Sequence, residues 1–232
     1  MKKILLATIA ILLLASMPVY ALPVLQLDAD PAIYVGGAEE STVPTSSAFT
    51  LTALLAGNRL CDGFTYLDYN FFIAAAIMPP QKDVAINFGS FAINGAAFDA
   101  DDMVWGTPPA APLEDDLAPH GVYETWYTEF AVTFTDDDVI SAYDVQYGTP
   151  APGNLYYVDF DVDVSGLDPA YGLHFDLYGY LKGDLSCKPD KTIVAPFSHD
   201  VNTKPVPEPS TMILLGLGLL GLIGGSKLRK KS

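Results

Sequence analysis

The chain has 232 residues, half of them hydrophobic, and a formal net charge of −16 at pH 7. Glu208 is the one acidic residue outside 22–204, and six of the twelve Lys and Arg lie outside that range, so residues 22–204 carry 27 acidic and 6 basic residues, a net charge of −21. A surface this negative repels phosphate backbones, which excludes nucleic acid as a partner and favours cations, basic partners or plain solubility.

Residues 1–21 have the pattern of a secretory signal peptide. Lys2 and Lys3 precede an apolar run at 4–15, and Val19-Tyr20-Ala21 offers small residues for cleavage. Twelve apolar residues, at about 1.5 Å rise each, are too few to cross a hydrocarbon core of about 30 Å. We therefore expect a signal helix that is removed on export rather than a permanent anchor.

Residues 22–204 are predicted to form one acidic exported domain rich in β-strands. Tyr, Phe, Val, Ile and Thr dominate this part of the chain, and Gly, Pro, Asn and Asp interrupt it at short intervals. No long segment has a helical period, so we predict an all-β fold, an antiparallel β-sandwich or jelly roll. The strongest strand candidates are 47–56, 64–77, 83–88, 121–134, 155–164 and 171–181.

Two cysteines, Cys61 and Cys187, lie 126 positions apart, which is not the spacing of a metal site. Export would place them in an oxidising compartment, where a disulfide is favoured over free thiols. Closing so long a loop would stabilise the fold by roughly 4–5 kcal/mol.

Three acidic clusters are candidates for a calcium site, because calcium prefers hard oxygen ligands on loops. In 155–164 the aspartates alternate with apolar residues, so they would line one face of a strand about 6.6 Å apart. None of the clusters completes an EF-hand loop. The alternative is a solvated acidic face with acidic turns. The candidate residues are Asp99, Asp101, Asp102, Asp136, Asp137, Asp138, Asp159, Asp161 and Asp163.

No motif in the sequence indicates an enzyme. His120, His174 and His199 show no H-x-H or H-x-x-x-H spacing, and nucleophile-elbow, P-loop and dinucleotide-binding patterns are missing. With so many carboxylates, the sequence does not exclude a catalytic pair of the glycosidase type, but no spacing indicates one. Trp105, beside Gly106, is predicted at an exposed loop tip where its ring could stack on a sugar.

Residues 205–232 form a separate C-terminal segment in three parts. Pro207-Glu208-Pro209 is followed by an apolar stretch at 212–225 and by a basic end. Fourteen residues are short for a membrane span, and snorkelling basic side chains bring the stretch to the required length. We predict a transmembrane helix whose basic end remains in the cytoplasm as a membrane stop. The basic residues are Lys227, Arg229, Lys230 and Lys231.

The order of these three parts at the end of the chain resembles the PEP-CTERM sorting signal. The residues that carry the resemblance are Val206-Pro207-Glu208-Pro209-Ser210-Thr211-Met212, followed by the apolar stretch and the basic end. The resemblance implies that an exosortase, a membrane-embedded cysteine peptidase, cleaves near Pro207-Glu208-Pro209. It also implies transfer from the inner membrane to the cell surface or exopolysaccharide matrix of a Gram-negative bacterium. It implies no activity for the delivered domain.

Residues 22–204 resemble the choice-of-anchor N group of surface proteins. Since that group has no assigned activity, no site residue carries over. The resemblance rests on Glu40-Ser41-Thr42-Val43, Pro119-His120-Gly121-Val122-Tyr123, Asp161-Val162-Asp163-Val164-Ser165-Gly166-Leu167 and Ala195-Pro196-Phe197-Ser198-His199-Asp200.

Two functional classes follow from these observations. The first is a non-catalytic surface or matrix protein, structural or adhesive, that binds calcium or exopolysaccharide. The second is a secreted hydrolase that acts on extracellular polysaccharide. Because no nucleophile or metal signature is present in the sequence, we favour the first class.

Overall fold

The computed structural model describes residues 22–36, 40–61, 63–84, 86–109, 124–183 and 192–203. These residues form strands and short 3-10 turns, which confirms the prediction of an all-β domain. The predicted signal peptide and the C-terminal segment both lie outside the described residues. Within the described ranges, no helix is long and apolar enough to cross a membrane.

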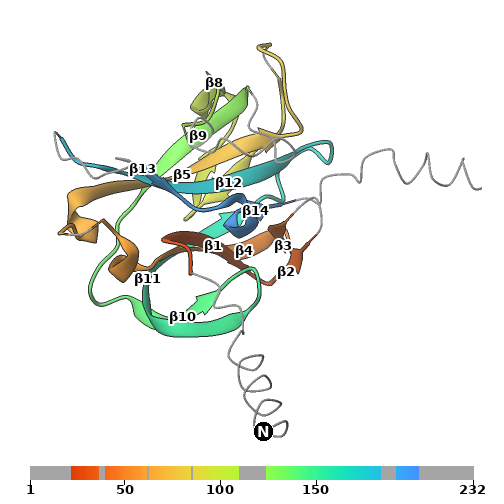
Figure 1. The fold of residues 1–232 in the computed structure, drawn as a ribbon. Coiled ribbons are helices and arrows are strands. Elements are labelled where there is room, and N and C mark those ends of the chain that lie inside the picture. Colours follow the sequence, from red (N-terminus) through yellow and green to blue (C-terminus); the bar gives the residue numbers. More distant parts are fainter. Residues whose placement is uncertain are drawn as a thin grey trace, which may run out of the picture.

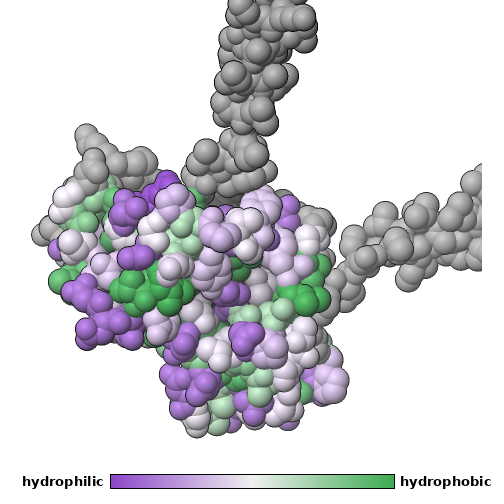
Figure 2. All heavy atoms as spheres, turned by 90° about the horizontal axis from the view of Figure 1, so that it is seen from below, coloured by the Kyte–Doolittle hydropathy of each residue, from purple (hydrophilic) through white to green (hydrophobic). Residues whose placement is uncertain are grey.

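One sheet contains six strands in the order β1-β4-β11-β6-β7, with β10 also paired to β11. Every pair in this sheet is antiparallel. The strand bounds are β1 (Leu25–Asp30), β4 (Ala48–Leu55), β6 (Phe91–Ile93), β7 (Ala96–Phe98), β10 (Val139–Asp144) and β11 (Thr149–Asp163). Seen from the side of β10 and β11, the molecule shows mostly hydrophilic and neutral residues, with hydrophobic ones in small separate patches (Figure 2).

The other sheet contains eight strands in the order β2-β3-β14-β12-β5-β9-β8, with β13 also paired to β12. One pair departs from the predicted antiparallel arrangement: β14, which follows the short turn η5 (Phe197–His199) and pairs antiparallel with β12, lies parallel to β3 on its other side. The strand bounds are β2 (Ala32–Val35), β3 (Ser41–Pro44), β5 (Tyr69–Met78), β8 (Val104–Gly106), β9 (Thr125–Val132), β12 (Gly172–Leu181), β13 (Thr192–Val194) and β14 (Val201–Asn202).

The two sheets share one hydrophobic core. Phe49 of β4 meets Phe175 of β12 with ring centroids 6.4 Å apart, and Phe130 of β9 meets Phe160 of β11 at 5.1 Å. Figure 1 shows β5, β9 and β12 on one side of this core and β1, β4 and β11 on the other. Side chains alternate along a strand, so Phe175 faces the core while its neighbours in β12 face outward.

Three of the predicted strands, at 47–56, 155–164 and 171–181, are confirmed as β4, β11 and β12. The candidate at 64–77 begins too early, because the chain first makes the turn η2 (Tyr66–Asp68), in which Thr65 and Asp68 form a capping box.

The candidate at 121–134 is confirmed as β9 from Thr125 onward, and 121–123 lie outside the described residues. The candidate at 83–88 is wrong, since its described residues form no strand and the chain makes only a single bridge there, between Gly89 and Leu167.

Candidate functional site

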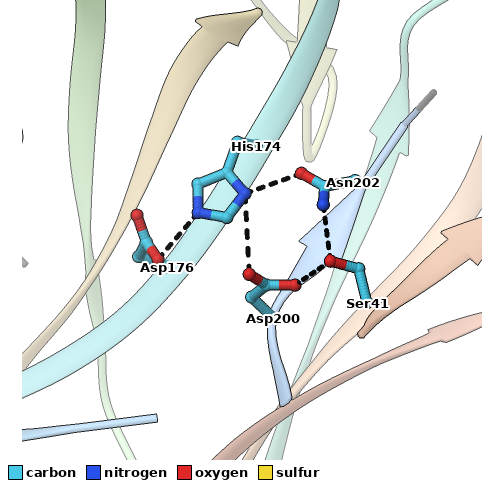
Figure 3. A network of polar contacts seen from close by, with 5 residues as sticks. All are labelled: Ser41, His174, Asp176, Asp200 and Asn202. Atoms are coloured by element: carbon cyan, nitrogen blue, oxygen red, sulfur yellow. Dashed lines mark hydrogen bonds and ion pairs between the residues drawn. The ribbon is translucent and has the colours of Figure 1, made fainter. Parts of the chain in front are cut away.

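A polar network joins strands β3, β12 and β14 (Figure 3). Because Phe175 and Val201 belong to the core and side chains alternate along a strand, the network lies on the opposite side of the eight-stranded sheet. Sheet pairing assembles it: His174 is the register partner of Asn202, and Val201 is the partner of Thr42. Ser41, Asp200 and Asn202 are all buried. The five members of the network are Ser41, His174, Asp176, Asp200 and Asn202.

The hydrogen bonds fix the protonation of His174. Asn202 Nδ2 donates to Ser41 Oγ at 2.5 Å, and Ser41 Oγ donates to Asp200 Oδ1 at 2.5 Å. The amide therefore turns its carbonyl oxygen toward His174, with Oδ1 2.6 Å from Nδ1, while Nε2 lies 2.9 Å from Asp176 Oδ1. Since both ring nitrogens face acceptors, both carry a hydrogen and the ring is an imidazolium.

The charges around the ring favour the same state. Burial lowers the pKa of His174, but the carboxylates of Asp176 and Asp200, together with its hydrogen bonds, raise that pKa to about 10. Asp200 Oδ2 lies 3.7 Å from Nδ1, and the Asp200 side chain is only 2% exposed. The network is therefore an ion-pair clamp that holds β14 to β12 and β3 at neutral pH.

The same side chains also satisfy a first test for a metal centre. His174, Asp176 and Asp200 each offer one ligand atom, and these three atoms lie within 4.8 Å of one another. Among the residues that the structure describes, no other three His, Cys, Asp or Glu side chains come together in this way. A cation binds neutral imidazole, however, and here both ring nitrogens hold protons. The two carboxylates also approach different nitrogens, so a cation would have to displace a proton and turn one carboxylate.

A second buried histidine, His199, lies next to the clamp and differs from His174 in its protonation. His199 Nε2 is 3.5 Å from Asp144 Oδ1, and Nδ1 is 2.8 Å from Ser198 Oγ. Burial lowers the pKa of His199, and this outweighs the negative charge of Asp144, which raises it. The ring is thus neutral at pH 7, with a serine hydroxyl on one side and a carboxylate on the other.

The structure does not gather the nine aspartates predicted for calcium into one group. In the described part of the chain, no three of them bring ligand atoms as close together as the clamp does. Asp99 and Asp102 instead cap the turn η3 (Ala100–Asp102), and Asp138 accepts a hydrogen bond from Thr135. These carboxylates serve their own turns, and both the calcium site and its alternative, a solvated acidic face, stay predictions.

The aspartates of β11 lie on the outer face of the six-stranded sheet, as the alternation predicts. Asp159 accepts a hydrogen bond from Thr52 at 2.6 Å. Hydrogen bonds from the side chain and backbone of Ser165 lower the pKa of the exposed Asp163. A shallow hollow of about 500 Å³ lies over this face, lined in part by Asp30, Asp161 and Asp163.

Trp105 is not at a loop tip, so that prediction is wrong. It lies on the edge strand β8, where it is the register partner of Trp126 in β9. The two indole rings meet edge to face with centroids 5.9 Å apart, and Trp105 is half-buried. The three residues from Val104 to Gly106 extend the sheet because β9 offers them an open edge.

Several other predicted site residues lie outside the described residues. They are Cys187, Pro207-Glu208-Pro209 and the basic end. Cys61 is described and has no free thiol, but its pairing with Cys187 stays a prediction.

The clamp itself was missed by sequence reasoning. One local signal was present: His174 and Asp176 are two positions apart in a strand, so they share a face. The remaining members, Ser41, Asp200 and Asn202, lie between 26 and 133 positions from His174 along the chain, and no spacing rule links them.

Comparison with known protein families finds a PEP-CTERM protein-sorting motif at residues 205–230. No curated protein and no solved structure matches the chain. The sorting signal predicted from Pro207-Glu208-Pro209 and its flanking residues is thereby confirmed, whereas the resemblance of 22–204 to the choice-of-anchor N group stays a prediction. The chain carries a PEP-CTERM sorting motif, which supports an exported protein that is sorted through exosortase.

Proposed function

We propose that this is a cell-surface or extracellular-matrix protein with a structural or binding role and no catalytic activity. One observation carries the proposal: a PEP-CTERM sorting motif lies at residues 205–230. The signal peptide at 1–21 would direct export, and the stretch at 212–225 would hold the protein in the inner membrane until exosortase cleaves near Pro207-Glu208-Pro209.

The exported part would be a β-sandwich, a compact form suited to a surface module. The ring contacts between Phe49 and Phe175 and between Phe130 and Phe160 support this architecture, since each joins one sheet to the other. The net charge of −21 would keep such a module soluble and would direct it toward cationic partners.

The end of the domain is well suited to carrying a tail that is cut. Thr203 donates its backbone N–H to the Leu173 carbonyl at 2.9 Å, and Leu173 N–H donates to Thr203 Oγ1 at 2.7 Å. Together with the His174 clamp, these bonds hold the chain in the sheet up to residue 203. Cleavage beyond this point would leave the fold intact.

The alternative is a secreted hydrolase that acts on polysaccharide. The contact of Ser198 with His199, and of His199 with Asp144, is the one observation that favours it, because a neutral imidazole can take a proton from a hydroxyl. The 3.5 Å separation from Asp144 exceeds a hydrogen bond, and the His199 ring is buried. We therefore prefer the non-catalytic role.

The test is sorting in a host that has an exosortase and in the same host without it. We expect the wild-type chain to lose its tail and reach the surface only in the first host. A variant with Pro207, Glu208 and Pro209 all changed to Ala should stay full-length in the inner membrane. The matched control is Ser198→Ala, which leaves the motif intact and should be processed like wild type.

Mass spectrometry of the surface and membrane fractions measures the outcome. Retention of the wild-type chain in the cytosol, or equal processing of the motif variant, would contradict the proposed function. Hydrolysis of matrix polysaccharide by wild type that Ser198→Ala abolishes would instead support the alternative.

A further inference from the structure

The Ser41 hydroxyl lies between a carboxylate and an amide in the buried part of the clamp (Figure 3). Ser41 Oγ is 2.5 Å from Asp200 Oδ1, to which it donates, and 2.5 Å from Asn202 Nδ2, from which it accepts. An amide C–N bond is about 1.33 Å long, so Asn202 Cγ lies roughly 3–3.5 Å from Ser41 Oγ. That is the separation from which a nucleophile attacks a carbonyl carbon.

Asp200 is placed to take the proton of this hydroxyl. A serine becomes a nucleophile when an adjacent base removes its proton as the oxygen attacks. Asp200 Oδ1 already accepts the Ser41 hydrogen, and the Asn202 nitrogen contacts the same oxygen from another side. One carboxylate therefore reaches both the attacking oxygen and the nitrogen that would leave.

His174 faces the carbonyl oxygen of the same amide. Its Nδ1 lies 2.6 Å from Asn202 Oδ1, and because the ring is an imidazolium, Nδ1–H donates to that oxygen. A donor held in this position stabilises the negative charge that develops on the oxygen when Cγ is attacked. The network thus contains a nucleophile, a base, a carbonyl carbon and an oxyanion donor, which are the parts of an acyl transfer.

We propose that Ser41 and Asn202 form an intramolecular ester that cross-links β3 to β14. Ser41 Oγ would attack Asn202 Cγ while its proton passes to Asp200. The Oγ–Cγ bond forms and the Cγ–Nδ2 bond breaks, and Asp200 returns the proton to the departing nitrogen, which leaves as ammonia. His174 and Asp200 end in the protonation states in which they began, so the reaction needs no oxidant, reductant or other co-reactant.

Burial favours this reaction over hydrolysis. Ser41, Asp200 and Asn202 are at most 4% exposed, so the serine hydroxyl rather than a water molecule faces the amide carbon. The same exclusion of water would protect the ester once it has formed.

The cross-link would lie where the chain leaves the domain toward the sorting motif. Among the strands that the structure describes, β14 is the last, and it has only two residues. A pull on the C-terminal end would therefore reach β14 first, and the ester would pass it to β3 through a covalent bond. The chemistry does not depend on the proposed function, but a surface protein that is held by its C-terminal end would gain resistance to such a pull.

Mass spectrometry of the purified full-length chain, with its disulfides reduced, tests the proposal. We expect wild type to be lighter than the mass calculated from its sequence by one ammonia molecule. After unfolding and digestion, the peptides that contain Ser41 and Asn202 should remain joined, and mild alkali should separate them because it hydrolyses esters and leaves amides intact. Ser41→Ala removes the nucleophile and Asp200→Asn removes the base, so both variants should have the full mass and separate peptides.

The matched control is Thr52→Ala, which removes a hydroxyl that donates to Asp159 at 2.6 Å on the outer face of the other sheet. This variant should keep the cross-link. Near-ultraviolet circular dichroism verifies that each variant is folded, and the wild-type result is decisive even where a variant does not fold.

Three results would overturn the proposal. They are a wild-type chain of full mass, separate peptides in spite of a loss of ammonia, and joined peptides in Ser41→Ala. The mass is measured on purified protein, whereas the sorting assay measures location and processing in cells, so the two proposals fail separately.

Discussion

Replacing His174 by Gln tests whether the clamp is an ion pair. Glutamine keeps a hydrogen-bonding amide but carries no charge, so Asp200, whose side chain is 2% exposed, would lose the cation that lies 3.7 Å from its Oδ2. Breaking a buried ion pair by removing one partner costs about 3–5 kcal/mol, because the remaining charge stays buried. We expect His174→Gln to lower the free energy of unfolding by that amount at pH 6.

The protonation of His174 gives an independent measure of the same effect. Its pKa rises from 6.5 to about 10 on folding, which corresponds to roughly 4–5 kcal/mol of tighter proton binding in the folded state. Because the folded pKa is raised, this contribution is fully present below pH 6.5 and is lost as the pH rises through about 10. The difference between wild type and variant should therefore shrink by about 1.4 kcal/mol per pH unit in this range.

Urea unfolding at pH 6, 7.5 and 9, followed by tryptophan fluorescence, measures the difference directly. His199→Gln is the control, because burial lowers the pKa of His199. Its contribution is present above pH 6.5 and is lost as the pH falls, which is the opposite trend. A loss below 1 kcal/mol at pH 6 for His174→Gln, or a loss that does not change with pH, would refute the ion-pair reasoning.

Three further outcomes follow from the described geometry. Gly179→Ala would place a Cβ atom 2.5 Å from Phe71 Cδ1. Such overpacking should lower the free energy of unfolding by about 1–3 kcal/mol and lower the melting temperature. An unchanged melting temperature would show that the Phe71 ring moves aside freely. Millimolar calcium should leave the melting temperature unchanged relative to chelator, because Asp99 and its neighbours already bond within their turns, and a rise of several degrees would instead establish a structural calcium site. The denatured, unreduced protein should contain no reactive thiol, and two reactive thiols would exclude the disulfide between Cys61 and Cys187.

Strand length decided how much of the fold could be predicted. β4, β11 and β12 are at least eight residues long, so their apolar alternation or continuous apolar character is visible in the sequence. β6, β7, β8 and β13 have three residues each and β14 has two, which is too short for any period to appear.

The segment 83–88 was predicted to be a strand, but its described residues do not form one. Val84 and Phe88 have strand-forming side chains, yet Val84 is exposed while Phe88 is buried, and the segment gains only one bridge at Gly89. A strand needs a partner with open hydrogen-bonding groups, and intrinsic preference does not provide one.

The sequence located the sorting motif but not the clamp, and the reason is physical. A sorting signal is read along the chain, so Pro207-Glu208-Pro209 and the residues after them are sufficient. The clamp depends on the fold: Ser41 and Asp200 are 159 positions apart. Of the two carboxylates that raise the pKa of His174, Asp176 lies on the same strand, but Asp200 is brought near only by the sheet pairing.

The position of the clamp explains why a charged group is buried there. A buried ion pair adds little net stability compared with apolar packing of the same volume, so its value lies in fixing one arrangement. β14 has two residues, pairs in parallel with β3 through a single register position, and has no hairpin to set its alignment. Shifting it by one residue would turn Asn202 away from His174 and bury Asp200 apart from the ring, at a cost of several kcal/mol. The ion pair thus favours the observed register of β14, together with its pairing with β12 and the two hydrogen bonds between Thr203 and Leu173.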